Sequence, residues 1–194
     1  CSSGTAALKI ALELLRSGKA TRVLAGGADA LCRLTYYGFH SLQLVDPGGA
    51  HPFDSDRKGM SVGEGAAMFL LTAAAVPPDR AVAELLGGAL TCDAHHPAAP
   101  HPAGEGARQA MGKGLADAGV LREEIDYIHL NGTGTTENDL AEGRAVRALF
   151  DGRPVPPASS LKGAWGHSLA AAGAMGAAVS ALAVREGLIP PNVG

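Results

Sequence analysis

Short apolar runs alternate with segments of helical periodicity from one end of the chain to the other. Leu8, Ala11, Leu12 and Leu15 have the i, i+3, i+4, i+7 spacing of an amphipathic helix, which stops at Ser17 and Gly18. Such alternation is typical of the α/β class, in which helices and strands pack in layers. The pattern also predicts strands at 22–30, 67–73, 81–91 and 125–130, and helices at 104–118, 137–150 and 168–184.

The clearest break in this pattern is at Pro77, Pro78 and Asp79. A turn-rich stretch, 46–66, precedes the strand that leads into it, and the alternation of strands and helices resumes after it. We therefore expect two parts, residues 1–78 and residues 79–194.

Charge and composition limit the kinds of partner. The chain has 16 basic and 19 acidic residues, a formal net charge of -3, so no excess of positive charge predicts nucleic acid or an anionic membrane surface. The longest uncharged run, 167–184, is rich in Ala and Gly rather than Leu and Ile, and this favours a tightly packed interior helix over a membrane span. A small or acyl substrate fits this composition better.

The cysteine and histidine patterns predict neither a disulfide framework nor a metal site. The 3 cysteines share no CxxC spacing, which favours a reducing, cytoplasmic location. His95, His96 and His101 follow Cys92 in a loop rich in Pro and Ala, but no second cluster at ligand spacing supports metal binding. We expect a solvated loop there.

Cys1 precedes the first predicted helix. A thiol at a helix N-terminus is exposed to the positive end of the helix dipole, which favours the thiolate. Cys1 is therefore a candidate nucleophile, although a free cysteine is commonly a small buried hydrophobe. Cys32 and Cys92 have no comparable sequence context.

A second candidate group lies in the segment SSLKGAWGH, 159–167. Lys162 and His167 stand in a glycine-punctuated loop before the Ala/Gly helix, where a flexible backbone can aim both side chains into one pocket. Taken alone, a histidine here is more often structural.

The third candidate is the loop NGTGTTEND, which begins at Asn131 after an apolar strand. Its threonines, Thr133 and Thr135, could cradle a phosphate or shape a narrow tunnel, but the loop lacks the lysine of a phosphate-binding P-loop. His129 lies two residues before Asn131, and residues i and i+2 of a strand share a face.

Taken together, the motifs CSSGTAAL, PFDSDRKGMSVGEGAA, NGTGTTEND and SSLKGAWGHSLAAAGA, in this order, resemble the β-ketoacyl-acyl-carrier-protein synthases of fatty acid and polyketide synthesis. The resemblance covers the whole chain. It implies a thiolase-like, layered αβαβα fold, of which the chain holds the end of the first half and most of the second. The family's segment before the nucleophile and its C-terminal glycine-rich loop are then missing, so the site is expected to be incomplete.

The resemblance also implies residue roles. Cys1 matches the nucleophile that accepts the acyl group, and His167 matches the second catalytic histidine, which donates a hydrogen bond to the thioester carbonyl of the extender unit. Lys162 matches a lysine that supports the site electrostatically. Glu64 matches a buried acid that orders the loops around it.

One position departs from the family pattern. The family's first catalytic histidine stands immediately before GTGT, where this chain has Asn131. An amide donates a hydrogen bond but has no titratable nitrogen, so we expect decarboxylation to suffer more than acyl transfer. Alternatively, His129 reaches the pocket from behind, or it is a core histidine packed beneath the strand.

Several functions stay open at this stage. The first is decarboxylative condensation of an acyl chain on Cys1 with malonyl-acyl-carrier protein. The second is a non-elongating ketosynthase that only transfers acyl groups because Asn131 has replaced histidine. The third is a non-catalytic partner subunit, which the presence of Cys1 disfavours, because such subunits have lost that cysteine.

The resemblance further implies how substrates and partners meet the enzyme. No bound cofactor is expected, because substrates arrive on the phosphopantetheine of acyl carrier protein. The expected assembly is a homodimer, or a heterodimer with another ketosynthase-like subunit, in which an acyl tunnel is completed across the interface.

Overall fold

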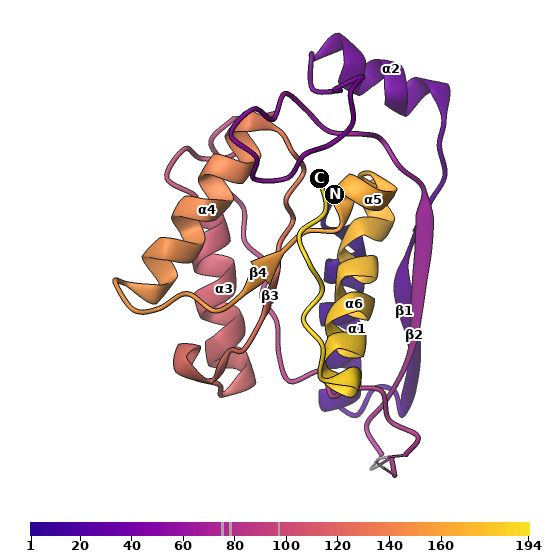
Figure 1. The fold of residues 1–194 in the computed structure, drawn as a ribbon. Helices are drawn as coiled ribbons and strands as arrows, with labels where there is room; N and C mark the ends of the chain where they lie inside the picture. The colour runs from indigo at the N-terminus through magenta and orange to yellow at the C-terminus, as the bar shows by residue number, and fades with distance from the viewer. Residues whose placement is uncertain (75, 78, 97) are drawn as a thin grey trace.

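Sheets and helices lie in alternating layers in the computed structural model (Figure 1), which describes residues 1–74, 76–77, 79–96 and 98–194. The helices α1 (Ser3–Arg16) and α6 (Ala172–Glu186) stand between two strand pairs. On one side are β1 (Arg22–Asp29) and β2 (Gly65–Thr72), and on the other are β3 (Ile128–His129) and β4 (Ala158–Ser159). A further pair of helices, α3 and α4, covers the outer side of β3–β4. This layering confirms the predicted α/β class.

The first part of the chain forms the β1–β2 layer. β1 (Arg22–Asp29) and β2 (Gly65–Thr72) pair antiparallel in a 2-stranded sheet, with Arg22 opposite Thr72 and Asp29 opposite Gly65. Both strands and α1 occur close to where the sequence predicts them. α2 (Arg33–Ser41) lies between the strands in the chain and projects from the end of the layer (Figure 1).

The two faces of β1–β2 differ because side chains alternate along a strand. Ala25, Phe69 and Leu71 face inward and pack with Leu8 and Ala11 of α1 in one apolar cluster. The opposite face carries the exposed apolar side chains Leu24, Met68 and Leu70. The buried face thus fixes α1, and with it the position of Cys1.

The second part of the chain forms the β3–β4 layer and its helices. β3 pairs parallel with β4, with Ile128 opposite Ala158. Leu130, Val146 and Phe150 form the buried cluster of this part, between the end of β3 and α4. Its elements are α3 (Glu105–Ala118), η1 (Arg122–Glu124), β3 (Ile128–His129), α4 (Thr136–Phe150), β4 (Ala158–Ser159), α5 (Lys162–Trp165), η2 (Leu169–Ala171) and α6 (Ala172–Glu186).

Two predicted strands differ from the structure. Segment 81–91 is not a strand: it has no pairing partner in the part of the chain that the structure describes, and Leu85, Leu86 and Leu90 are exposed. The strand predicted at 125–130 shortens to Ile128–His129, because β4 offers it only a short partner. An apolar run indicates that a segment favours an extended conformation, but a β-strand also needs a neighbouring strand to pair with.

Helix α2 was not predicted. Every side chain of this helix is exposed or partly exposed, so its sequence lacks the buried stripe that produces helical periodicity. Short helices of this kind leave little signal in a hydrophobic pattern.

The Ala/Gly helix lies between the layers, but its buried residues are confined to its first turns, at Ala172, Ala174 and Gly176, so the prediction of a tightly packed interior helix holds only for that end. α6 contacts β1 and β2 on one side and β3 on the other, although Leu182 and Val184 near its end are exposed. By length and composition alone, Leu169–Glu186 would also be long and apolar enough to cross a membrane, which is weak evidence in either direction. The predicted boundary falls on Pro77, Pro78 and Asp79, and Pro78 lies outside the described residues.

Candidate active site

Lys162 and Asn131 are directly bonded at the junction of β3, β4 and α5. The Lys162 ammonium donates to the Asn131 side-chain oxygen at 3.2 Å and also to its backbone carbonyl. Lys162 is 5% exposed, and this burial lowers the pKa of its ammonium to about 8, while the charges of Glu142 and Asp139 act in the opposite direction. Two of the predicted site residues are therefore in contact.

Two carboxylates of α4 hold the loop that begins at Asn131. Glu142 accepts the backbone N–H groups of Asn131 and Gly132 at 2.7 and 2.8 Å. Asp139 accepts those of Thr133 and Gly134 at 3.0 and 3.1 Å. The course of the whole loop is thus set by the helix that follows it.

Sequence analysis missed Asp139 and Glu142. They lie three residues apart near the start of α4, directly after a glycine-rich loop. An acidic residue in the first turn of a helix faces free N–H groups, and this was the available signal for Asp139. Glu142 lies about one turn further along α4 and gave no such signal. Burial raises the pKa of the Glu142 carboxyl, and its two N–H donors act in the opposite direction.

Asp139 also connects the two parts of the chain. It accepts the backbone N–H of Phe53 at 2.8 Å, and the Arg57 guanidinium lies 3.7 Å from the same carboxylate. Asp139 itself is 2% exposed. One buried carboxylate therefore joins the PFDSDR loop to the GTGT loop.

His167 is fixed by its backbone and buried. Its N–H donates to the Ser61 carbonyl at 2.7 Å, and its carbonyl accepts the N–H of Gly63 at 2.9 Å, so the loop before β2 pairs with it. Its Nδ1 is buried and has no hydrogen-bond partner among the residues that the structure describes. Desolvation first, and then the positive charge of Lys162, lower the pKa of the imidazole to about 3.

Cys1 lies beside this loop. The first turn of α1 packs closely on the segment that follows His167. A Cβ on Gly4 would stand 2.7 Å from the Ala170 carbonyl oxygen, so glycine is needed at this crossing. The structure therefore brings Cys1, Lys162, Asn131 and His167 to one region, and Cys1 is exposed.

Cys1 is not alone in lying at a helix start, which corrects the sequence analysis. Cys32 is the N-cap residue of α2, and its sulfur bonds to the hydroxyl of Thr35 at 3.1 Å and accepts the N–H of Thr35 at 3.4 Å. These bonds lower the pKa of the Cys32 thiol. Cys32 is exposed, so thiol reactivity alone does not single out Cys1.

His129 is bonded beneath its strand. The Ser159 hydroxyl donates to the Pro190 carbonyl at 2.8 Å, so its oxygen accepts the hydrogen of the Tyr127 hydroxyl. Because the Tyr127 hydroxyl donates to Ser159, its oxygen accepts from Nδ1–H of His129 at 2.9 Å. The edge of the ring that carries Nε2 lies against Gly176 of α6, where a Cβ would stand 2.7 Å from it. This geometry favours the core-histidine interpretation over a route into the pocket.

Glu64 differs from its expected environment. The resemblance implies a buried acid, but Glu64 is exposed in this chain. Its carboxylate accepts the N–H of Leu31 at 3.0 Å, so it still fastens the segment between β1 and α2. A side chain at a layer edge is buried only by neighbouring segments, and those described here leave it open.

The two threonines of the GTGT loop are bonded to each other. Their hydroxyl oxygens are 2.9 Å apart, and Thr133 is buried while Thr135 precedes the first turn of α4. They lie on the loop that α4 holds, next to Asn131. Their proposed place along a substrate tunnel stays a prediction.

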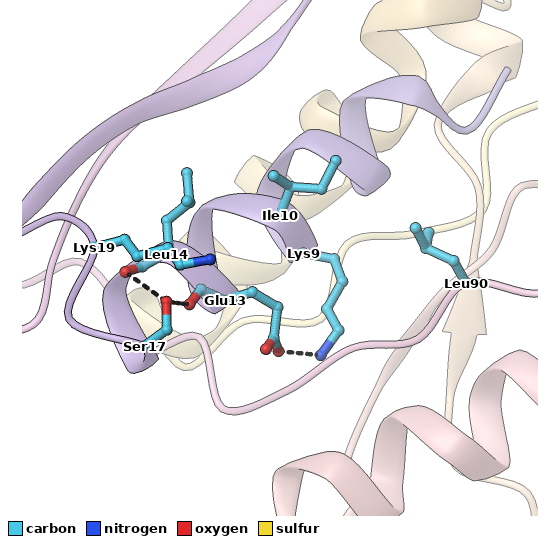
Figure 2. A pocket seen from close by; sticks show the side chains of 7 residues that line it. All are labelled: Lys9, Ile10, Glu13, Leu14, Ser17, Lys19 and Leu90. Atoms are coloured by element: carbon cyan, nitrogen blue, oxygen red, sulfur yellow. Dashed lines mark hydrogen bonds and ion pairs between the residues drawn. The ribbon is translucent and has the colours of Figure 1, made fainter.

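Other regions with pocket-like character lie away from these residues. A cavity of about 330 Å³ opens between the C-terminal half of α1 and Leu90, lined by Lys9, Ile10 and Leu14 among others (Figure 2). His95 and His101 stack edge to face at 5.0 Å, but within the described ranges no cluster of metal-binding side chains occurs. Neither region contains a predicted site residue.

This layered arrangement of helices and sheets is the fold of the thiolase-like proteins. Two family models match the chain: "Beta-ketoacyl synthase, N-terminal domain" over residues 1–76 and "Beta-ketoacyl synthase, C-terminal domain" over residues 82–194. The chain belongs to the β-ketoacyl synthase family.

Individual relatives agree. The chain is 34% identical to 3-oxoacyl-[acyl-carrier-protein] synthase 2 of Synechocystis sp., over 100% of the chain and 49% of that protein. It is 38% identical to the ishigamide ketosynthase/chain length factor, with a TM-score of 0.92 over 99% of the chain and 48% of that structure. A type II PKS acyl-carrier protein in complex with its ketosynthase gives 28% identity and a TM-score of 0.91, over 99% of the chain and 50% of that structure. The chain spans about half the length of the curated relatives it matches.

Proposed function

We propose that the complete protein is a β-ketoacyl-acyl-carrier-protein synthase, an acyltransferase that condenses an acyl chain held on Cys1 with malonyl-acyl-carrier protein. One observation carries the proposal: the buried Lys162 ammonium donates to the side-chain oxygen of Asn131 at 3.2 Å, at the start of the short helix that leads to buried His167. Residues from distant parts of the chain meet there, and they are those that the family resemblance selects.

The first step is acyl transfer. The Cys1 thiolate attacks the carbonyl carbon of the acyl thioester, a new C–S bond forms, and the bond to the phosphopantetheine sulfur breaks. The departing thiolate takes up the proton that Cys1 has lost. Cys1 is exposed and stands one residue before the N-cap of α1, so it is open to a carrier-borne substrate and lies at the positive end of the helix.

The second step is decarboxylation and condensation. The C–C bond of the malonyl thioester breaks, carbon dioxide leaves, and the electron pair forms an enolate that His167 and Asn131 stabilise by donating hydrogen bonds to its oxygen. The enolate carbon then attacks the acyl-Cys1 carbonyl and expels the cysteine thiolate. At neutral pH the pKa of about 3 keeps His167 uncharged, so it acts as a hydrogen-bond donor rather than as a cation.

A second candidate function is acyl transfer without elongation. It is favoured by Asn131, which cannot exchange a proton and whose oxygen and one N–H group are already bonded to Lys162 and Asn138. Only one N–H group of the Asn131 amide then remains for substrate. This candidate predicts acylated Cys1 and no β-ketoacyl product.

Partners and organisation are part of the proposal. We expect substrate delivery by acyl carrier protein and a dimer with a second ketosynthase-like subunit, in keeping with the assemblies named for the related structures. We place the two halves at residues 1–78 and 79–194, supported by family-model matches that end at 76 and resume at 82. A cytoplasmic location accords with the exposed free thiols Cys1, Cys32 and Cys92.

Mass spectrometry of the complete protein tests the proposal. Incubation with carrier protein that bears an acyl group should transfer that group to the synthase. Later addition of malonyl-carrier protein should convert the bound acyl group to a β-ketoacyl product. Loading without product would select the non-elongating function. Absence of loading would contradict both.

A further inference from the structure

The side-chain amides of Asn131 and Asn138 connect the Lys162 ammonium to the Asp139 carboxylate beside the candidate site. Lys162 donates to Oδ1 of Asn131 at 3.2 Å, and Nδ2 of Asn131 donates to Oδ1 of Asn138 at 3.0 Å. Nδ2 of Asn138 then donates to the Asp139 carboxylate at 3.0 Å. All these hydrogen bonds run in the same direction, from the ammonium to the carboxylate, and we call this set the amide chain.

The two ends of the amide chain determine how each amide is turned. An ammonium can only donate, so Asn131 must present its oxygen to Lys162. Both carboxylate oxygens of Asp139 accept from N–H groups, so Asn138 must present its nitrogen to Asp139. Turning either amide over would place donor against donor or acceptor against acceptor, and the orientation of Asn131 is therefore set from both sides.

This orientation leaves Asn131 with one N–H group to spare. Its Nδ2 has two hydrogens, of which Asn138 takes one, and Asn131 is exposed while its backbone is fixed by Glu142. The Lys162 ammonium that donates to its oxygen also polarises the amide, which strengthens the remaining N–H as a donor. The amide is thus prepared to donate before any substrate arrives.

We propose that Asn138 is a positioning residue that orients Asn131 for donation to the substrate thioester oxygen. The inference rests on the proposed function, because it assigns that oxygen as the acceptor. Asn138 is hydrogen-bonded to Asn131 and Asp139, and of these two partners Asn131 is the one assigned to the substrate oxygen. Loss of Asn138 should leave the Asn131 amide less well oriented and so lower the rate of decarboxylation, because small misplacements of a catalytic donor lower rates strongly.

A double-mutant cycle in the complete protein tests this dependence. Asn138→Leu keeps the side-chain size but removes the acceptor, and should lower carbon dioxide release from malonyl-carrier protein about tenfold. In an Asn131→Ala background the same change should have no further effect, because the residue it orients is gone. Gln109→Leu is the matched control: its exposed amide donates to Glu105 on the surface of α3, and the release rate should not change. Additive losses in the cycle would overturn the proposal.

A second measurement needs no substrate. In protein labelled with 15N-asparagine, the Asn131 side-chain signals are assigned by their loss in Asn131→Ala, and their hydrogen exchange is compared with and without Asn138. Exchange should be about tenfold faster in Asn138→Leu, or in Asn138→Ala if the leucine variant does not fold. Equal exchange rates with and without Asn138 would overturn the proposal, whether or not the unmodified protein releases carbon dioxide. Absence of carbon dioxide release would instead contradict the proposed function.

Discussion

The ammonium nitrogen of Lys162 lies 3.2 Å from the side-chain oxygen of Asn131. The residue that stands where the family resemblance places a histidine is therefore bonded to the lysine that the same resemblance implies. The Lys162 ammonium is buried, so its positive charge acts directly on the Asn131 amide, which is the candidate hydrogen-bond donor to substrate.

The buried lysine predicts a rise in stability at alkaline pH. The folded-state pKa of Lys162 is about 8, lowered from 10.5 by burial, so between these values the unfolded chain binds more protons and the free energy of unfolding increases with pH. From pH 7.5 to 9.5 we expect about 1–2 kcal/mol from this residue. Urea unfolding should show that Lys162→Met lacks this increment; an identical pH dependence in both proteins would refute the assignment.

Asp139 should be a major determinant of stability. It accepts N–H groups from Phe53, Thr133 and Gly134 and lies near Arg57, so Asp139→Ala leaves several buried groups without a partner. We expect a loss of about 3–5 kcal/mol in the free energy of unfolding. Glu137→Ala, at an exposed position in the same helix, should cost less than about 0.5 kcal/mol. Similar losses for the two variants would show that the carboxylate does not join the loops.

Acyl transfer should be more selective among the cysteines than alkylation. Iodoacetamide should label both Cys1 and Cys32, because both are exposed at helix starts and the pKa of Cys32 is lowered. An acyl group from carrier protein should appear on Cys1 alone, and Cys32→Ser should still accept it at Cys1. Peptide mapping that locates the acyl group on Cys32 or Cys92 would refute the choice of nucleophile.

His129 should contribute to stability rather than to condensation. Burial lowers the pKa of its imidazole to about 4, so between pH 4 and 6.5 the unfolded chain binds more protons and stability falls as the pH decreases. His129→Asn keeps a donor for Tyr127 without titrating, and should lose about 1 kcal/mol less than the parent between pH 7 and 5, allowing for partial exposure of the ring. Loss of condensation at pH 7 in a folded His129→Asn variant would instead place His129 in the pocket.

The sequence predicted the elements whose patterns arise from local burial. α1, β1, β2 and α4 all follow hydrophobic periodicities that pack within this chain. The unpaired segment 81–91 failed because strand formation depends on a neighbour, and α2 was missed because its side chains form no buried stripe. The failures therefore concern interactions that hydrophobic periodicity does not encode.

The candidate site shows the same division. Cys1, Lys162, Asn131 and His167 were selected from motifs, and the structure brings them to one region. The carboxylates of Asp139 and Glu142 were not selected, because their function is to accept backbone N–H groups of a loop whose course the sequence does not show. Likewise, only the hydrogen bonds of Asn131 reveal which way its amide is turned.

The most direct test of the account is the rate of carbon dioxide release by the complete protein, its Asn131→His variant and its Asn131→Leu variant, each loaded with an acyl group. If Asn131 donates a hydrogen bond to the enolate oxygen, Asn131→Leu should release carbon dioxide about a hundredfold more slowly than the parent. Asn131→His should release it at least as fast as the parent, because an imidazole restores a donor that also exchanges protons. Acyl loading, measured in parallel, separates these effects from damage to Cys1. Equal release rates for the three proteins would contradict the account, because Asn131 would then take no part in decarboxylation.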